Sequence, residues 1–367
     1  MTPSASVIVP CWNSSACLGA CLDSLRDGTC ADFEIIAVDD GSDDDTFEVL
    51  SRAAASDPRI RPFRRPHGGV SAARNFGLGQ AVGRVVFFVD PDDTVAPDFL
   101  AKPLARLDAT GADFVIFAYA ARRDGERDFT PRPLRAAYDF ASNAEIRAHF
   151  LPRVFGYSLD RVREWNRGAP LFGRRELGSV CRCAFRRDFL RRADIRFDET
   201  LVLNEDAMFL SEAALAAASM ASLDEPLYFY AIHATGAMIS VDRDRRMFGN
   251  KLRLLRKRRE LDRREGGALE AAYAGSCVFS LMELLHLTRV IDIPFAESHR
   301  VVADYASDPV VRRALSRFPL SVRHPVAALL VILLRLRLAR PLHAFLHVVF
   351  LPARRSGRRA RRYAGIR

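Results

Sequence analysis

The chain has 367 residues, of which 49% are hydrophobic and 27% are charged. This balance is typical of a folded globular protein and excludes the disordered and fibrous classes. The net charge of +10 comes from one end, because residues 309–367 contain 14 arginines and no aspartate or glutamate. Such a basic segment indicates an anionic surface as partner, either nucleic acid or membrane lipid.

The first 120 residues alternate short β-branched or aromatic runs with helical stretches. The predicted strands are residues 6–10, 33–40, 60–65, 84–90 and 113–119. The predicted helices between them are residues 16–26, 44–55, 70–81 and 97–109. Continuous apolar strands separated by helices predict an α/β fold with a parallel sheet covered on both faces. In such sheets ligands bind beyond the carboxyl ends of the strands.

The rest of the chain is more mixed, and Arg122–Pro133 is predicted to be a loop that leaves the sheet. We expect helices at 185–193, 205–218, 245–265 and 269–291, and a short strand at 226–231. No metal-ligand spacing recurs among the seven cysteines, which indicates a structural or incidental role. The N-terminus lacks the basic start and apolar core of a signal peptide, so we expect reduced thiols and a cytoplasmic location.

An acidic turn, Asp90-Pro91-Asp92-Asp93, follows the strand predicted at 84–90. Three carboxylates within four residues repel one another, and a hard divalent ion such as Mg²⁺ or Mn²⁺ would offset that repulsion. The alternative is a solvated turn that caps the next helix. The residues of this turn leave the choice open.

Two more polar segments lie where strands are predicted to end. Asp39-Asp40-Gly41-Ser42 closes the second strand, and its carboxylates could accept hydrogen bonds from a base or ribose, or could cap the next helix. In the segment from His67 to Gly77, a glycine pair opens a helix whose N-terminus suits an anion. Arg74 lies one turn into that helix, where a surface ion pair is the alternative.

These motifs, in this order, resemble glycosyltransferase family 2, the inverting enzymes of the GT-A fold. The resemblance covers roughly residues 4–240. It rests on Ser6–Asn13, Val38–Ser42, Gly69–Gly77, Val89–Asp93 and Arg196–Phe209. It implies a Rossmann-like, mixed and mostly parallel sheet with flanking helices, a nucleotide-sugar donor and a divalent metal cofactor, Mg²⁺ or Mn²⁺.

The resemblance also implies roles for single residues. Asp40 would read the nucleobase, usually uracil, and Asp39 would support that loop, beside Pro10 and Asn13. Arg74 would contact the nucleotide or its phosphates. Asp92 would lie near the ribose, Asp93 would hold the metal and Asp90 would shape the turn. Asp206 would be the general base, beside Glu205.

The proposed base also has support from its local sequence. Asn204 is a candidate N-cap that places Glu205 and Asp206 in the first turn of a helix. The helix dipole favours negative charge there, so we expect Asp206 to be ionised at neutral pH. The alternative is that the two carboxylates only compensate the helix dipole and have no catalytic role.

Two stretches depart from the family pattern. Val180–Phe185 stands where polysaccharide-building relatives typically show a Trp-Asn-Lys-like run, which puts the acceptor pocket in doubt. Trp12 stands where tyrosine is usual. Weaker candidates are the pair Glu283 and His286, and His233, which lies where relatives bring a loop over the donor.

The apolar run in residues 325–334 is too short to span a bilayer as a helix. The arginines that follow it would be costly at mid-membrane. Two short helices, 326–340 and 342–351, followed by the arginine cluster at 354–362, fit a segment that lies on an anionic inner leaflet. A packed helical core with a basic end is the alternative.

We therefore predict a GT-A domain at 1–240, a helical extension at 241–318 and an apolar, arginine-rich segment at 319–367. The expected partners are a nucleotide-sugar donor with UDP as its nucleotide, a glycan or lipid-linked acceptor, and the anionic membrane. No nucleic acid is expected as a partner. One rival is a catalytically inactive membrane- or polyanion-binding protein. The other is an NAD(P)-dependent oxidoreductase, although the first strand lacks a Gly-x-Gly-x-x-Gly turn.

Overall fold

The computed structural model describes four long segments, residues 2–134, 136–155, 178–232 and 246–269, and shorter pieces after them. Those pieces are residues 273, 276, 300, 303, 307, 309–317, 325–336 and 341. The chain forms two compact units, residues 1–151 with 178–236, and residues 152–177 with 237–367. All the residues to which we assigned a catalytic, donor-binding or metal role lie in the first unit.

One mixed sheet organises the first unit, in the order β3-β2-β1-β4-β8-β6-β9-β5, with β7 paired to β6. Strands β1 to β4, β6 and β9 run in one direction, and β5, β7 and β8 run against their neighbours. The bounds are β1 Ala5–Cys11, β2 Phe33–Asp39, β3 Ile60–Arg64, β4 Val85–Phe88, β5 Thr94–Val95, β6 Phe114–Arg123, β7 Thr130–Arg132, β8 Cys183–Arg186 and β9 Met220–Ile232. The predicted mixed, mostly parallel sheet is confirmed.

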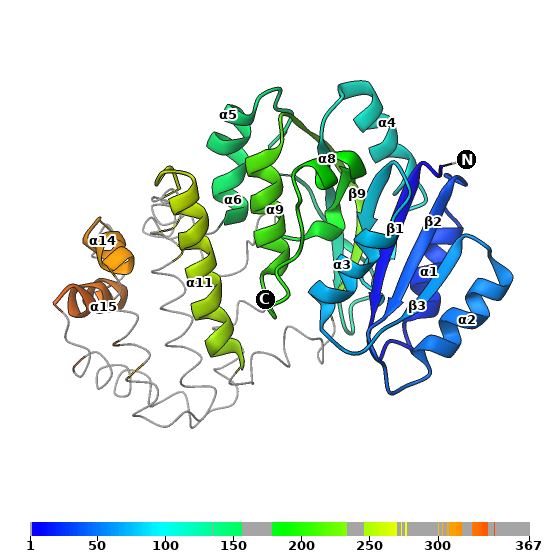
Figure 1. The fold of residues 1–367 in the computed structure, drawn as a ribbon, viewed down its shortest axis with the longest axis horizontal. Helices are drawn as coiled ribbons and strands as arrows, with labels where there is room; N and C mark the ends of the chain where they lie inside the picture. Colours follow the sequence, from blue (N-terminus) through cyan, green and yellow to red (C-terminus); the bar gives the residue numbers. More distant parts are fainter. Residues whose placement is uncertain are drawn as a thin grey trace. The chain divides into compact units, whose positions relative to one another are not determined.

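Helices cover both faces of the first strands. Every residue of β1 and β2 is buried, which explains their unbroken apolar runs. Helix α3 packs on β1 and β2, and α1 is seen behind these strands in the same view (Figure 1). The helices of this unit are α1 Leu18–Arg26, α2 Thr46–Ser56, α3 Val70–Gln80, α4 Ala101–Thr110, α5 Asn143–Glu145, a π-helical turn Ile146–Phe150, α8 Arg187–Arg192 and α9 Glu205–Ala216.

The sheet differs from the prediction in its second half. The expected loop at Arg122–Pro133 is wrong at both ends, because β6 continues to Arg123 and β7 pairs back onto it. The expected helix at 185–193 begins two residues late, because Phe185 and Arg186 belong to β8. Strand β8 lies between β4 and β6, so its conformation is fixed by two ladders from distant parts of the chain rather than by its own sequence.

The second unit is described in part. Its helices are α11 Arg246–Arg264, α14 Pro309–Arg317 and α15 Pro325–Arg335, and α6 Leu151–Phe155 lies at the junction of the two units. Helices α14 and α15 pack on each other. The predicted helices at 245–265 and 326–340 correspond to α11 and to the described part of α15, whereas 342–351 and most of 269–291 lie outside the described residues. In the described part of the chain, no helix is both long and apolar enough to cross a bilayer.

Two glycines of α3 give a matched test of this packing. A Cβ at Gly77 would lie 2.5 Å from Ile8 Cγ2 in buried β1, whereas a Cβ at Gly79 would have no atom within 4 Å. We expect Gly77→Ala to lower the free energy of unfolding by about 1–3 kcal/mol through overpacking. Gly79→Ala should raise it by up to about 1 kcal/mol through helix propensity. Thermal melts of both variants test this, and a shift of the same sign in both would contradict it.

Candidate active site

The loops after β1 and β2 are joined at the carboxyl edge of the sheet. The Asp40 N–H donates to the Cys11 carbonyl (2.8 Å), and the Asn13 N–H donates to Ser42 Oγ (2.9 Å). The Asn13 side chain in turn accepts from the Asp43 N–H (2.9 Å). Asn13 has a φ of 48°, a left-handed conformation that asparagine tolerates better than most residues. The predicted donor-site residues of these two loops therefore share one edge.

The two aspartates that close β2 are both buried. The Asp40 carboxylate accepts from the Gly68 N–H (3.1 Å), the Gly69 N–H (2.7 Å) and Arg65 Nη1 (2.8 Å). Asp39 accepts from the Ser42 N–H (3.1 Å), and Arg64 Nε lies 3.2 Å from its other oxygen. Asp40 thus holds the glycine loop in front of α3, and its role as reader of the nucleobase stays a prediction.

An aromatic pair lies next to this loop. The rings of Trp12 and His67 stack with their centroids 4.8 Å apart and their planes at 28°. Trp12 is 53% exposed, unusually high for so large an apolar side chain. From the sequence, Trp12 stands out only as a substitution in the family pattern, and neither ring is given a function. The feature that could have indicated this pair is the aromatic residue directly after the end of β1.

The acidic turn after β4 is tied to β9 through Asp93. The Tyr228 hydroxyl donates to Asp93 Oδ2 (2.5 Å), and the Ala231 N–H donates to Oδ1 (2.8 Å). Burial, followed by the charges of Asp90 and Asp92, raises the pKa of Asp93 to about 8. Both Asp93 oxygens therefore have protein partners, one of them a tyrosine that sequence analysis did not select. Asp93 as metal ligand stays a prediction.

The exposed carboxylates of this turn are better placed to bind a divalent ion than the buried Asp93. Asp92 is exposed and the Asp90 side chain is 32% exposed, so oxygen ligands of both can reach the space outside the sheet. Among the residues that the structure describes, no group of three His, Cys, Asp or Glu side chains is arranged to hold a metal. The turn could supply only part of a coordination sphere, and other oxygens would have to complete it.

Arg74 brings together carboxylates from distant parts of the chain. Its guanidinium is 3% exposed and contacts Asp90 Oδ1 (2.8 Å) through Nη2. Through Nη1 it contacts Asp206 Oδ1 (2.6 Å) and Glu205 Oε1 (3.1 Å). The predicted base thus lies beside the acidic turn, joined to it by one side chain. The predicted contact of Arg74 with a nucleotide stays untested.

The environment of the predicted base corrects the argument from the helix dipole. Burial raises the pKa of Asp206, and Arg74 only partly offsets it. Burial and the Asp206 charge likewise raise the pKa of Glu205. Asn204 occupies the N-cap position of α9 with a left-handed φ of 65°, but its side chain makes no capping hydrogen bond. Three carboxylates around one guanidinium leave excess negative charge, which favours retention of a proton.

The segment that departs from the family pattern lies against the same carboxylate. Val180–Arg182 forms a short 3-10 helix, and the Val180 N–H donates to Asp206 Oδ2 (3.2 Å).

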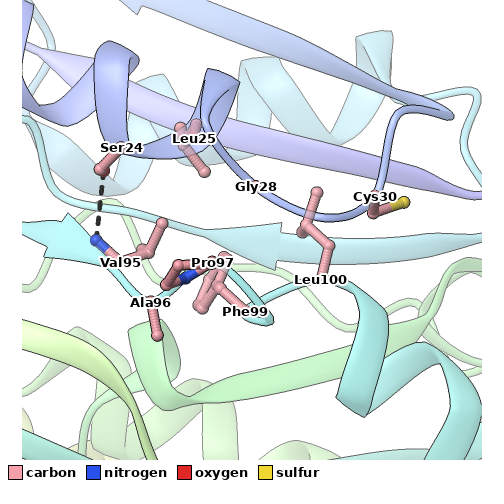
Figure 2. Close-up of a pocket in the computed structure, with 9 residues that line it drawn as sticks. All are labelled: Ser24, Leu25, Gly28, Cys30, Val95, Ala96, Pro97, Phe99 and Leu100. Carbon is pink, nitrogen blue, oxygen red and sulfur yellow. Dashed lines mark hydrogen bonds between the residues drawn. The ribbon is translucent and has the colours of Figure 1, made fainter.

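The weaker candidates Glu283, His286 and His233 lie outside the described residues. A small pocket, shown in Figure 2, is lined mainly by apolar groups and contains none of the predicted site residues. In this pocket Ser24 Oγ accepts from the Val95 N–H, so its lining residues serve to pack α1 against β5.

Residues 6–171 match the family model described as glycosyl transferase family 2. The chain is thus similar to family 2 glycosyltransferases over these residues. It is 30% identical over 230 residues to the uncharacterized glycosyltransferase EpsJ of Bacillus subtilis, covering 63% of this chain and 61% of that protein. It is 31% identical over 245 residues to the succinoglycan biosynthesis protein ExoO of Rhizobium meliloti, covering 65% and 63%. The match thus spans about three fifths of the length of these relatives.

Solved structures support the same assignment at the level of the fold. S. aureus TarS 1-349 in complex with UDP-GlcNAc superposes with a TM-score of 0.62 at 18% identity, over 95% of this chain and 92% of that one. This likeness shows the GT-A fold, which confirms the fold expected for the family 2 domain. The match to the family model also favours the transferase over the oxidoreductase alternative.

Proposed function

We propose that the chain is an inverting glycosyltransferase that moves a sugar from a nucleoside diphosphate sugar, with UDP as the nucleotide, to a hydroxyl of a glycan or lipid-linked acceptor. The observation that carries this proposal is the cluster in which Arg74 joins Asp206 at the start of α9 to Asp90 after β4. A base beside the donor edge of the sheet is what a single displacement requires. The name of ExoO, a succinoglycan biosynthesis protein, supports cell-surface polysaccharide as the product, and the TarS complex with UDP-GlcNAc supports UDP.

The proposed reaction uses one displacement at the anomeric carbon. Asp206 accepts the proton of the acceptor hydroxyl while the hydroxyl oxygen forms the new glycosidic bond. The bond to the nucleoside diphosphate breaks, its electron pair leaves with the diphosphate, and the configuration inverts. The carboxylates of the acidic turn, Asp90, Asp92 and Asp93, would hold a divalent ion. When bound, this ion neutralises charge on the leaving diphosphate.

Asp206→Asn tests the base directly. The amide keeps the shape of the side chain but cannot accept the proton, so transfer should fall by about 10²–10⁴-fold. UDP binding, measured by thermal shift with Mn²⁺, should persist. Asp188→Asn is a matched control, because this carboxylate lies on α8, is 66% exposed and forms an ion pair with Arg192. Transfer by Asp206→Asn at the wild-type rate, followed as nucleotide release, would refute the assignment.

The Trp12 and His67 stack is proposed to receive the base of the nucleotide. Aromatic stacking on a base contributes about 1–3 kcal/mol, so Trp12→Ala should weaken UDP binding by about 5–150-fold, whereas Trp12→Phe should keep most of it. Because Trp12 is half exposed, the melting temperature should change little. Isothermal titration with UDP measures the effect, and equal affinity in wild type and Trp12→Ala would exclude this role.

Membrane contact by the C-terminal segment remains a proposal. The apolar side chains of Leu329 and Ile332 on α15, and of Leu336 directly after its end, are exposed, and their spacing of three and four residues is that of one helical face. The arginine cluster at 354–362 follows along the chain. An apolar helical face with nearby basic residues suits a surface of anionic lipid.

A chain that ends at Pro352 tests this contact. Each of the six arginines of the cluster contributes about 1 kcal/mol at an anionic surface, so their loss should abolish co-sedimentation with vesicles that contain phosphatidylglycerol. Binding of the full chain should weaken with added salt and be absent for neutral vesicles. UDP binding of the shortened chain is the control. Equal sedimentation of both chains would contradict the proposal.

A further inference from the structure

The guanidinium of Arg74 faces protein rather than an open site. The residue is 2% exposed, and its terminal nitrogens are engaged with Asp90, Glu205 and Asp206. The ring of Phe197 lies under it, with the guanidinium carbon 5.2 Å from the ring centroid. An arginine that binds a diphosphate has to offer its N–H groups to a solvent-filled site. Arg74 instead offers them to carboxylates.

The neighbouring residue of α3 reaches the same part of the chain. Asn75 Nδ2 donates to the Phe197 carbonyl (2.9 Å) and to Glu199 Oε1 (2.9 Å), and its oxygen accepts from the Phe197 N–H (2.9 Å). Arg74 and Asn75 together fasten α3 to the segment from Phe197 to Asp206, although more than 120 residues separate the two in sequence. This segment ends at the proposed base.

Asp206 is held through both of its oxygens. Oδ1 accepts from Arg74 Nη1 (2.6 Å), and Oδ2 accepts from the Val180 N–H (3.2 Å). Two contacts from different elements fix the plane of a carboxylate better than either contact alone. Without the Arg74 contact, the orientation of the carboxylate would depend on the Val180 N–H and on the neighbouring Glu205.

The charges that face Asp206 make Arg74 important for its ionisation. Arg74 on α3 lowers the pKa of Asp206, whereas Asp90 on the acidic turn raises it. Glu205 on α9 shares the Arg74 guanidinium, and the thiols of Cys181 and Cys183 also lie within electrostatic range of Asp206. Arg74 is the one cation among these described groups. Its removal would leave three carboxylates unpaired and favour protonation of the base.

We propose that Arg74 is a positioning residue for the general base, which orients Asp206 and keeps it able to accept a proton, and that it is not a ligand of the nucleotide. This inference rests on the proposed function. It predicts that Arg74 acts on the rate of the chemical step and leaves donor binding to the loops after β1, β2 and β4.

The test compares Arg74→Gln and Arg74→Lys with the full-length wild type. At pH 7, kcat of Arg74→Gln should fall at least about tenfold, because Asp206 loses both the cation that favours its ionised form and a contact that orients it. The acid limb of its pH profile should move to higher pH, so that alkaline buffer restores part of the rate. UDP affinity should stay within about twofold of wild type, as expected for a change without shared contacts. Lysine keeps the charge and should give a smaller shift.

The outcomes separate the inference from the function on which it rests. A large loss of UDP affinity in Arg74→Gln, with the pH profile unmoved, would show a nucleotide ligand and overturn the inference. If the glutamine variant does not fold, the split between kcat and donor KM in Arg74→Lys decides the same question. Asn75→Ala, which breaks the same fastening without a change of charge, should leave the acid limb in place. Full transfer by Asp206→Asn would instead refute the proposed base.

Discussion

The candidate site depends on the burial of one positive charge among three negative ones. Arg74 is almost inaccessible to water, and a guanidinium in that position is tolerated only when carboxylates neutralise it. Its partners lie 16, 131 and 132 residues away in sequence. The cluster therefore couples the strand that ends at the donor edge to the helix that carries the base, and loss of Arg74 would leave all three carboxylates without this cation.

The acidic turn uses its carboxylates in different ways, and burial separates them. Asp93 is turned into the protein, where Tyr228 and the Ala231 N–H hold it against β9. Asp92 stays exposed at the same turn. Burial and two hydrogen bonds make Asp93 an anchor of the turn, whereas the exposed Asp92 can reach a cation in solution. The anchored Asp93 fixes the position from which Asp92 extends.

Local sequence predicted the first half of the fold because its signals are local. The apolar runs of β1 and β2 are buried on both faces, and the motif residues follow directly at the ends of those strands. The second half depends on pairing over long distances. Strand β8 is four residues long and is inserted between β4 and β6, and no periodicity in Cys183–Arg186 could indicate this.

The site shows the same division between local and distant information. The position of Glu205 and Asp206 in the first turn of a helix followed from the sequence around Asn204. The raised pKa of Asp206 did not, because it arises from burial and from Asp90, which lies 116 positions earlier in the chain. The sequence predicts the start of the helix, and with it the effect of the helix dipole. It does not predict the burial of Asp206, whose effect on the pKa outweighs that of the dipole.

The unusual segment at Val180–Phe185 can now be placed in this scheme. Its contact with the proposed base is made by a backbone N–H, that of Val180, which any residue except proline would supply. Replacement of the side chains in this segment therefore need not disturb the orientation of Asp206. Every residue of this segment is buried, so its side chains pack inside the protein. The departure from the family pattern therefore leaves in place the backbone contact that orients the proposed base.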